Sequence, residues 1–324
     1  MTEVKAKKKI ILLVNLGSPN ELSVSAIRLF LAKFLSDKRV VNLPRILWYP
    51  ILYGVILPFR SKKLLKLYNK IWHKSGISPL IYYTNAQAEK LAGNYTNNVI
   101  VRSAFCYSDP EIKDLLIDMH TQYEITDLKV IPLYPQFSST TTLPVFDQVA
   151  NFYKNKYYLP NIQIVRGFHD NEKYINLITD KIKYSWDKNG KADRLILSYH
   201  SLPLNIIAHG DLYYDECKKS SELIAKKLNL TANDYMVTFQ SKFGRQKWLT
   251  PATNLALMAL AQKKMSVDII CPGFVSDCLE TLEEINVTNR ELFMLNGGLD
   301  YTYIECLNDD DYFVNVIKDI ICAV

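Results

Sequence analysis

One histidine, His200, stands at the end of an apolar run that reads as a strand, Leu195–Tyr199. The residues around it are Ser198-Tyr-His-Ser-Leu-Pro203. An imidazole in this position can accept a proton near neutral pH or hold a metal ion. It can equally bond a backbone carbonyl at the end of the strand. Position alone therefore leaves a chemical and a structural interpretation of His200 open.

Three acidic residues further along the chain have a spacing that suits one face of a helix. Asp277, Glu280 and Glu284 stand at i, i+3 and i+7. Like charges at i, i+4 cost about a few tenths of a kcal/mol on a helix, so the acidic face needs a reason, such as a path for a cation or a proton. The alternative is capping, with Asp277 as N-cap and Glu280 at the third helical position. Both can hold, because a capped N-terminus is also well aimed into a cleft.

A charge-free run of 14 residues, Ile46–Phe59, lies in the first third of the chain. It is shorter than the roughly 20 residues that cross a bilayer, and Pro50 and Pro58 interrupt it. It can be ordinary core, or an exposed lip that touches a membrane or a flat apolar ligand. Basic residues follow at once, which suits carboxylates on an apolar molecule or anionic lipid heads, although a solvated helix face explains each of them singly. They are Arg60, Lys62, Lys63 and Lys66.

Short apolar runs alternate with longer amphipathic ones, which predicts βαβ units and buried parallel sheets. The strands are expected at Ile10–Leu16, Val99–Phe105, Leu128–Leu133, Ile162–Val165, Leu195–Tyr199, Met236–Phe239 and Val267–Cys271. The helices are expected at Ser25–Leu35, Pro110–Gln122, Phe146–Asn155, Asn171–Trp186, Tyr213–Leu228, Thr250–Gln262 and Asp277–Ile285. Seven units are many for one sheet, so we expect two successive doubly wound domains joined near residue 160. Ligands of such folds bind beyond the carboxyl ends of the strands.

The bulk composition excludes several classes of protein. The chain has 324 residues, is 48% hydrophobic and 22% charged, and carries a net charge of +6. No basic array alternates with aromatic residues, so we expect no nucleic-acid partner. None of the six cysteines forms a CxxC pair, and neither GxGxxG nor a Walker motif occurs. A disulfide framework, a thiolate metal site and the usual nucleotide loop are therefore not expected. The first residues lack the pattern of a signal peptide, and we expect a cytoplasmic protein.

Six segments, taken in order, resemble the ferrochelatase family over about residues 9 to 306. They are Leu13-Val-Asn-Leu-Gly-Ser-Pro19, Ser78-Pro79 after Gly76, Leu133-Tyr-Pro-Gln-Phe-Ser-Ser139, Ser198-Tyr-His-Ser-Leu-Pro203, Gln240-Ser-Lys-Phe-Gly244 with Trp248, and Cys271-Pro-Gly-Phe-Val-Ser-Asp-Cys-Leu-Glu-Thr-Leu-Glu-Glu284. Each motif alone is weakly specific, whereas six in family order are very specific.

The resemblance implies an α/β fold. Two similar Rossmann-like, chelatase-type domains would each hold a parallel four-stranded sheet flanked by helices, with a cleft between the domains. The first domain would cover residues 1–160 and include the active-site lip at about 43–66, and the second would cover 161–305. A C-terminal helix at 306–324 would pack back on the first domain.

The resemblance also implies the roles of individual residues. His200 and Glu280 would be catalytic and would contact the metal, and Asp277 and Glu284 would relay protons or iron. Arg60 and Ser78 match positions that meet the porphyrin propionates. The full set of residues implied to bind the porphyrin is Leu16, Arg60, Ser78, Phe137, Ser138, Tyr213, Trp248 and Phe274.

The activity that the resemblance implies is insertion of Fe²⁺ into protoporphyrin IX, giving protohaem and two protons, by a lyase of haem biosynthesis. The alternatives are the same chemistry on coproporphyrin III and a porphyrin or haem carrier without catalysis. The long lip favours protoporphyrin, because a tetrapyrrole with two carboxylates partitions into a membrane more readily than one with four. Fe²⁺ is then a substrate, and no cofactor is permanently bound. The lip is a candidate for peripheral contact with the inner face of the membrane.

Some members of the family hold an iron–sulfur centre on a cysteine cluster near the C-terminus. Here only Cys306 and Cys322 lie in that region, 16 residues apart. We therefore expect no iron–sulfur cluster.

Overall fold

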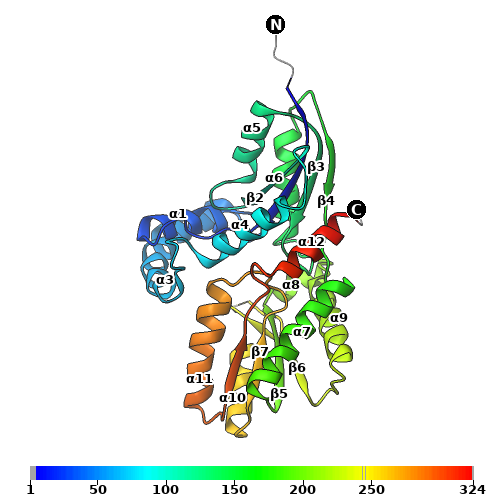
Figure 1. Cartoon of the computed structure of the whole chain (residues 1–324). Coiled ribbons are helices and arrows are strands. Elements are labelled where there is room, and N and C mark those ends of the chain that lie inside the picture. The colour runs from blue at the N-terminus through cyan, green and yellow to red at the C-terminus, as the bar shows by residue number, and fades with distance from the viewer. Residues whose placement is uncertain (1–4, 243, 245, 323–324) are drawn as a thin grey trace. The chain divides into compact units, whose positions relative to one another are not determined.

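The computed structural model describes residues 5–242, 244 and 246–322, and the chain divides into two compact units. The first unit runs to Leu133 and also includes Ser139–Gly167 and the residues from Asp309 on. The second unit consists of Tyr134–Ser138 and Phe168–Asn308. The chain therefore enters the second unit at two places, after Leu133 and after Gly167 (Figure 1).

The first unit is built on a parallel sheet whose strand order is β2-β1-β3-β4. Its strands are β1 (Lys7–Asn15), β2 (Val99–Phe105), β3 (Glu124–Pro132) and β4 (Asn161–Ile164). From Ile10 on, β1 is buried at every position. A strand covered on both faces reads as a continuous apolar run, which explains why its sequence does not alternate.

Helices cover both faces of this sheet, because each right-handed crossover places its helix on the face set by the direction of the step. The helix α4 (Pro79–Ala92) packs against α12 (Asp311–Cys322), and α5 (Ile112–Gln122) packs against α6 (Thr142–Tyr153). Lys90 of α4 lies 2.9 Å from an Asp311 carboxylate oxygen, and Lys129 Nζ donates to the Ile321 carbonyl at 2.8 Å. These bonds fasten α12 to the first unit.

The charge-free run forms a helical excursion on the first unit, after α1 (Val24–Leu35). It consists of α2 (Arg45–Ile51), the π-helix η1 (Leu52–Ile56) and α3 (Leu57–Ile71). Proline has no N–H and crowds the preceding turn, and a widened π turn is one way to absorb this. With Pro50 inside α2 and Pro58 at the start of α3, the wide turn lies between the two prolines. None of the helices in the described residues is long and apolar enough to cross a membrane.

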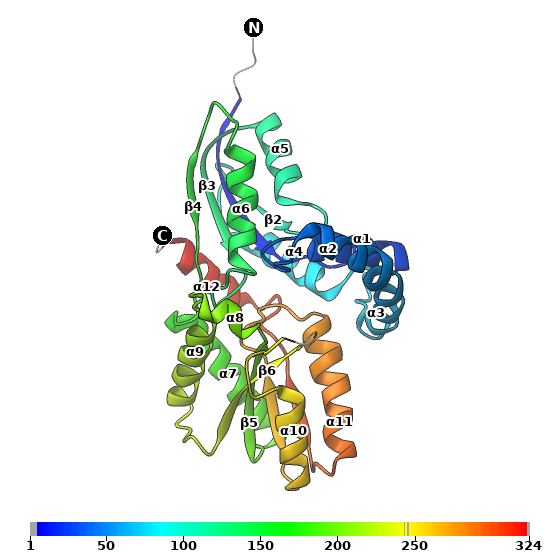
Figure 2. The same cartoon turned by 180° about the vertical axis from the view of Figure 1, so that it is seen from behind.

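The second unit repeats the same topology with the strand order β6-β5-β7-β8, again all parallel. Its strands are β5 (Arg194–His200), β6 (Tyr235–Gln240), β7 (Val267–Ile270) and β8 (Tyr301–Ile304). The helices α7 (Glu172–Asn189) and α9 (Tyr213–Lys227) pack together on one face. On the other face α10 (Thr253–Gln262) packs with α11 (Arg290–Leu295), as Figure 2 also shows.

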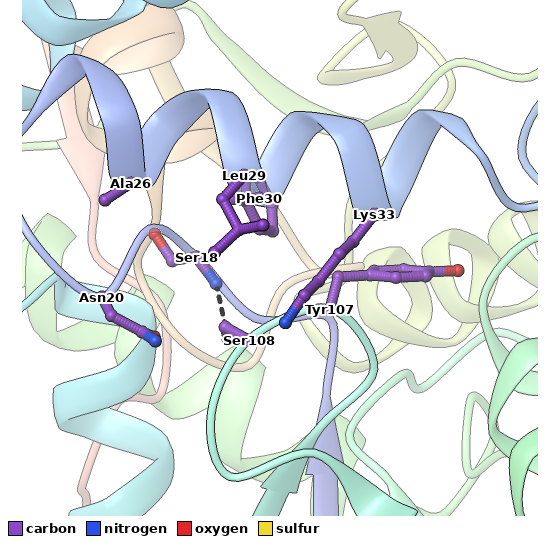
Figure 3. Close-up of a pocket in the computed structure, with 8 residues that line it drawn as sticks. All are labelled: Ser18, Asn20, Ala26, Leu29, Phe30, Lys33, Tyr107 and Ser108. Atoms are coloured by element: carbon purple, nitrogen blue, oxygen red, sulfur yellow. Dashed lines mark hydrogen bonds between the residues drawn. The ribbon is translucent and has the colours of Figure 1, made fainter. Parts of the chain in front are cut away.

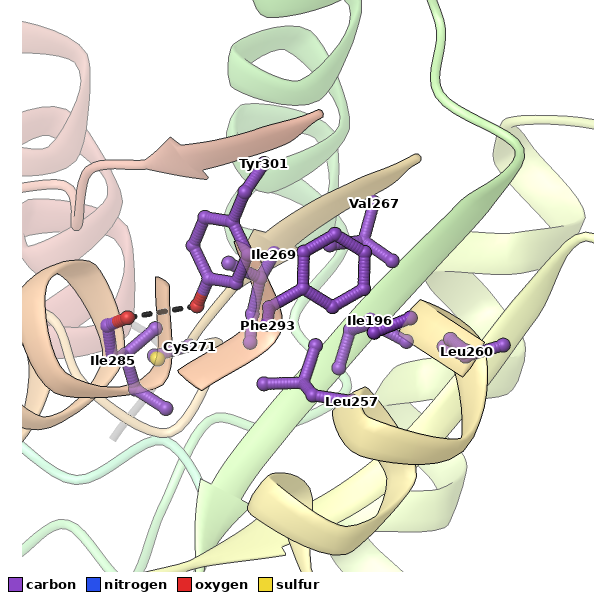
Figure 4. Close-up of a cluster of buried hydrophobic side chains, with 10 residues drawn as sticks. Ile196, Leu257, Leu260, Val267, Ile269, Cys271, Ile285, Phe293 and Tyr301 are labelled. Atoms are coloured by element: carbon purple, nitrogen blue, oxygen red, sulfur yellow. Dashed lines mark hydrogen bonds between the residues drawn. The ribbon is translucent and has the colours of Figure 1, made fainter. Parts of the chain in front are cut away.

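The core of the second unit lies between its sheet and the α10–α11 layer (Figure 4). Ile196, Val267 and Ile269 face Leu257 and Phe293, and all five side chains are fully buried. Gly298 closes this core, because a Cβ at that position would lie far inside van der Waals contact with the Phe293 ring. Only glycine fits there.

The predicted α/β fold with two parallel four-stranded sheets flanked by helices is confirmed. All seven predicted strands form, and β8 was missed. The predicted helices form as well, but α2, η1, α3, α4, α11 and the short helix at Leu204–Ala208 were not predicted from the pattern. The helix α12 was expected only from the family resemblance. In each sheet the first strand of the unit is central and its neighbours are the second and third strands.

Candidate active site

The strand order defines where a ligand site is expected in the second unit. Crossovers run in opposite directions from β5 to β6 and from β6 to β7, so β5 and β7 flank the topological switch point, where open α/β folds bind ligands. His200 is the last residue of β5, and Cys271–Glu284 follows β7 directly. The two segments singled out for their chemistry thus leave the sheet side by side.

The hydrogen bond made by His200 fixes its tautomer. Its Nδ1 lies 2.7 Å from the carbonyl oxygen of Ser201. A carbonyl can only accept, so Nδ1 carries a proton, and in the neutral ring Nε2 is then the nitrogen with the free lone pair. The structural interpretation of His200 is confirmed, and the chemical one stays open beside it, because the backbone bond engages Nδ1 alone.

Gln240, the last residue of β6, connects the segments around this histidine. Its side chain is 2% exposed and accepts a hydrogen bond from Ser198 Oγ at 2.7 Å. The side-chain Nε2 of Gln240 donates to the Glu280 carbonyl at 2.9 Å. The backbone carbonyl of Gln240 accepts from Ser201 N at 2.8 Å. One buried amide therefore sets the position of the Glu280 backbone relative to the end of β5.

Glu284 is held by the residue that follows Gln240. It accepts hydrogen bonds from Ser241 N, at 2.8 Å, and from Ser241 Oγ. Ser241 has a φ of 62°, a left-handed conformation that costs a non-glycine residue about 1 kcal/mol or more. The strained turn points both of its donors at one carboxylate.

The pKa of the Glu284 carboxyl shows that it senses both His200 and Glu280. Burial raises the pKa of the Glu284 carboxyl, the two bonds from Ser241 and the nearby His200 lower it, and the charge of Glu280 raises it. The net pKa lies above the ordinary value for a glutamate. His200 and Glu280 therefore lie near enough to Glu284 to act on its charge, and the segments beyond β5 and β7 bring an imidazole and two carboxylates to one region.

The acidic helix begins one residue later than predicted. It is the π-helix η2 (Leu279–Asn289), and Cys278 is its N-cap, with Thr281 completing the capping box. The prediction of Asp277 as N-cap and of Glu280 at the third helical position is therefore wrong. Cys278 N donates to Thr281 Oγ1 at 2.9 Å, so the buried Cys278 and Thr281 form the cap without a carboxylate. Glu280 and Glu284 still lie about one turn apart in the wider helix.

Asp277 lies before this helix and has a full set of partners. Its carboxylate accepts from Thr281 Oγ1 at 2.8 Å, from Asn308 Nδ2 at 2.7 Å and from the hydroxyl of Tyr303. It is 2% exposed. These bonds anchor the start of η2 to the segment that follows β8.

The residues implied to bind porphyrin fall into both units. In the second unit, Phe137 N donates to Glu216 and Ser138 Oγ donates to Asp211. Tyr213 is 8% exposed and packs inside this unit. Trp248 pairs with Pro203, just beyond the end of β5. Phe274 packs against the core that Figure 4 shows. Of the quoted loop motif, Phe243 lies outside the described residues.

The remaining three, Leu16, Arg60 and Ser78, belong to the first unit. Leu16 follows β1 at the carboxyl edge of that sheet, and Arg60 lies on α3. Ser78 is the N-cap of α4, and its Oγ accepts from Ile81 N at 3.4 Å.

The conformation of Gly17 explains part of the first family motif, Leu13–Pro19, which lies in the first unit. Gly17 has a φ of 100°, and a Cβ there would overlap the Ser108 hydroxyl. Ser108 Oγ accepts from Ser18 N at 3.2 Å beside a cavity of about 30 Å³, room for about one water molecule (Figure 3). Lys33 and Tyr107 line the same cavity.

Sequence reasoning assigned no role to Gln240, Ser241, Asp211 or Glu216. Gln240 and Ser241 had a usable signal, because both stand in the segment beyond the end of a predicted strand. Asp211 and Glu216 had none, since their partners are 73 and 79 residues away. Among the residues that the structure describes, no three or more His, Cys, Asp or Glu gather as a resident metal site.

The fold is of the chelatase type, and two solved proteins share it. SirB from Bacillus subtilis, solved with Fe³⁺, superimposes with a TM-score of 0.59 at 11% identity, covering 97% of this chain and 95% of that one. CbiX, described as the terminal enzyme of siroheme biosynthesis in denitrifying bacteria, superimposes with a TM-score of 0.53 at 11% identity, covering 98% of this chain and 99% of that one. At such identities the likeness shows the fold alone.

The sequence comparisons show the family. The ferrochelatase family model matches residues 8–324. The ferrochelatase of Aliivibrio fischeri (strain MJ11) is 42% identical over 318 residues, 98% of each chain. That of Proteus mirabilis (strain HI4320) is 43% identical over 312 residues, 96% of each chain. The chain belongs to the ferrochelatase family and is a metal chelatase of the lyase class, which confirms the resemblance drawn from the six motifs.

Proposed function

We propose that this enzyme inserts Fe²⁺ into protoporphyrin IX to give protohaem, with release of two protons. The observation that carries the proposal is the cluster at the switch point of the second unit, where His200 donates from Nδ1 to the Ser201 carbonyl and both His200 and Glu280 act on the Glu284 carboxyl. Metallation must remove two pyrrole protons, and this cluster offers more than one acceptor.

The proposed roles follow from the chemistry of each group. His200 accepts a pyrrole proton at Nε2, and neutral imidazole is also a suitable ligand for Fe²⁺. Glu280 serves as second proton acceptor or as an oxygen ligand. Glu284, whose pKa is raised by burial, passes the proton on, because a carboxyl with a raised pKa binds and releases protons closer to neutral pH. Asp277 stands behind Glu280, and its three hydrogen bonds favour a role in placing the helix.

The porphyrin contacts remain proposals that rest on the family resemblance. In the second unit they are supported by the position of Trp248 and Phe274 on segments that follow β6 and β7. Phe137 and Ser138 follow β3 of the first sheet and are bound to the second unit through Glu216 and Asp211. In the first unit, Leu16 has the same kind of position. Arg60 supplies a permanent positive charge that suits a propionate carboxylate.

The exposed side chains of the helical excursion support peripheral contact with a membrane. Ile46 is 84% exposed, Leu47 63% and Phe59 74%, which is unusual for residues of this size in one segment. Lys62, Lys63 and Lys66 follow on α3 and suit anionic headgroups. Such a surface would bring a cytoplasmic enzyme to the inner face of the membrane, where a dicarboxylate porphyrin accumulates.

Anaerobic metallation by the purified enzyme tests the proposal. With Fe²⁺ and protoporphyrin IX we expect turnover, and in His200→Ala a kcat lower by about 10²–10⁴-fold with porphyrin binding retained. His209→Ala is the matched control, because His209 also bonds a backbone carbonyl through Nδ1 but is exposed at the end of α8 (Leu204–Ala208). Faster turnover of coproporphyrin III would change the substrate, and tight porphyrin binding without turnover would indicate a carrier.

Sedimentation with anionic vesicles tests the membrane contact. We expect Ile46→Asp and Phe59→Asp to reduce the bound fraction, because each places a charge on the apolar surface. Leu295→Asp is the control, since Leu295 is equally exposed at 86% but lies on α11 of the second unit. Equal binding of all three variants and the wild type would contradict the proposal.

A further inference from the structure

A short irregular segment of the second unit, Gln136–Ser138, runs alongside the start of α9. Each of its three residues is bound by a different side chain there, in antiparallel order. The bonds join Gln136 Nε2 to Ser220 Oγ at 2.9 Å, Phe137 N to Glu216 Oε2 at 2.7 Å, and Ser138 Oγ to Asp211 Oδ2 at 3.0 Å. The segment is therefore placed by α9 and not by the sheet.

Glu216 is the central member of this series and is 5% exposed. A buried carboxylate is costly unless it is paired and hydrogen-bonded. The same oxygen that accepts from Phe137 N lies 3.2 Å from Nδ1 of His169. Glu216 also lies in the first turn of α9, where the helix dipole favours a negative charge.

His169 belongs to the other stretch at which the chain enters the second unit. Its carbonyl accepts from Ser220 Oγ at 2.8 Å, and the neighbouring Phe168 N donates to the Pro135 carbonyl at 2.8 Å. The Glu216 carboxylate therefore ties residues 134–138 to residues 168–170, although these are separated by some 30 positions in the sequence.

Net stability is a weak reason for such an arrangement. A buried polar or ionic pair is often no more stabilising than apolar side chains of similar size, whereas it can specify one geometry. The geometry specified here is that of Phe137 and Ser138, two residues to which the proposed function assigns porphyrin contact.

We propose that Glu216 is a positioning residue for the porphyrin, acting with His169 through the main chain of Phe137. It touches neither substrate nor metal. It holds the Phe137 ring and the Ser138 hydroxyl in the arrangement that accepts the porphyrin, and so determines the affinity for that substrate. The inference rests on the proposed function.

The test is steady-state metallation with the porphyrin varied and Fe²⁺ saturating. We expect Glu216→Ala to raise KM for the porphyrin about tenfold or more, since bonds to charged groups are the strong ones, with kcat within about threefold of wild type. Glu216→Gln keeps an oxygen that can accept from Phe137 N, and its KM should return to within about threefold of wild type. Glu222→Gln, an exposed position on the same helix, is the matched control.

A double-mutant cycle tests the partner. His169→Ala should raise KM in the same direction, and adding it to Glu216→Ala should raise KM little further, because both act on one contact. An unchanged KM in a folded Glu216→Ala variant overturns the inference, and so does a loss of kcat alone that follows the melting temperature. These results would leave the proposed function intact, whereas a wild type that metallates neither porphyrin would overturn both.

Discussion

Replacing Glu284 by glutamine separates the catalytic proposal from the stability of the fold. Glutamine has the same shape, its oxygen can accept from Ser241 N, and its NH₂ can donate to Ser241 Oγ once that hydroxyl turns. The variant therefore keeps both hydrogen bonds and loses only the titratable carboxyl. We expect it to be folded and to turn over porphyrin much more slowly.

The stability of the variant should also lose a dependence on pH. The pKa of Glu284 is raised in the folded enzyme, so this group favours folding fully below its unfolded pKa, about 4.3, and less as the pH rises through the folded pKa. The free energy of unfolding of wild type minus that of Glu284→Gln should fall across this window. Its slope can reach about 1.4 kcal/mol per pH unit, the value for one proton, and above the window the difference is constant.

Urea unfolding at several pH values between 4 and 8, followed by circular dichroism, measures this difference. The metallation rate of the same preparations gives the catalytic effect. If the free energy of unfolding of wild type minus that of Glu284→Gln rises with pH, the pKa of Glu284 is lowered in the folded enzyme. That result would refute our account of the burial of Glu284. If Glu284→Gln lacks the pH dependence contributed by this carboxyl and is still fully active, the proposed proton relay through Glu284 is refuted.

Three further predictions concern residues whose neighbours leave no room, or no hydrogen-bond partner, for a different side chain. Gly298→Ala should lower the free energy of unfolding by about 1–3 kcal/mol, because the new Cβ displaces the Phe293 ring, and thermal unfolding measures this loss. Gly17→Ala should destabilise by a similar amount through its positive φ and the overlap with Ser108, and a wild-type melting temperature would contradict this reason. In Asp277→Asn the new side-chain NH₂ faces the NH₂ of Asn308, so two buried donors meet and the free energy of unfolding measured with urea should fall by about 1–3 kcal/mol. The kcat of this variant should fall less than that of Glu280→Gln.

The sequence pattern was most informative where burial is uniform along an element. The central strands β1 and β5 are continuous apolar runs, and both were predicted close to their observed bounds. The strand β8 was missed because Tyr301–Ile304 contains only four residues, two of them half-buried, with no clear period. The helices α2 and α3 were missed because prolines interrupt the pattern and the apolar side chains there face outward.

The candidate site was predicted in its residue types and only partly in its geometry. The histidine and glutamates could be found, because they follow strands in segments that also carry the family motifs. The N-cap was placed wrongly, since a carboxylate is a commoner cap than a thiol and the pattern could not show that Asp277 is engaged by Tyr303 and Asn308. Contacts such as that of Glu216 with Phe137 depend on how distant segments pack, and local spacing carries no record of this.

The late position of α12 in the chain has a consequence for how the protein is made. The helix belongs to the first unit, where it packs on α4 and is held by Lys90 and Lys129. During synthesis the residues of the second unit are therefore all available before the first unit can complete its outer layer. A chain truncated after residue 308 should contain a complete second unit and a first unit that lacks α12 and remains open to proteases, the reverse of the order in which their first strands emerge.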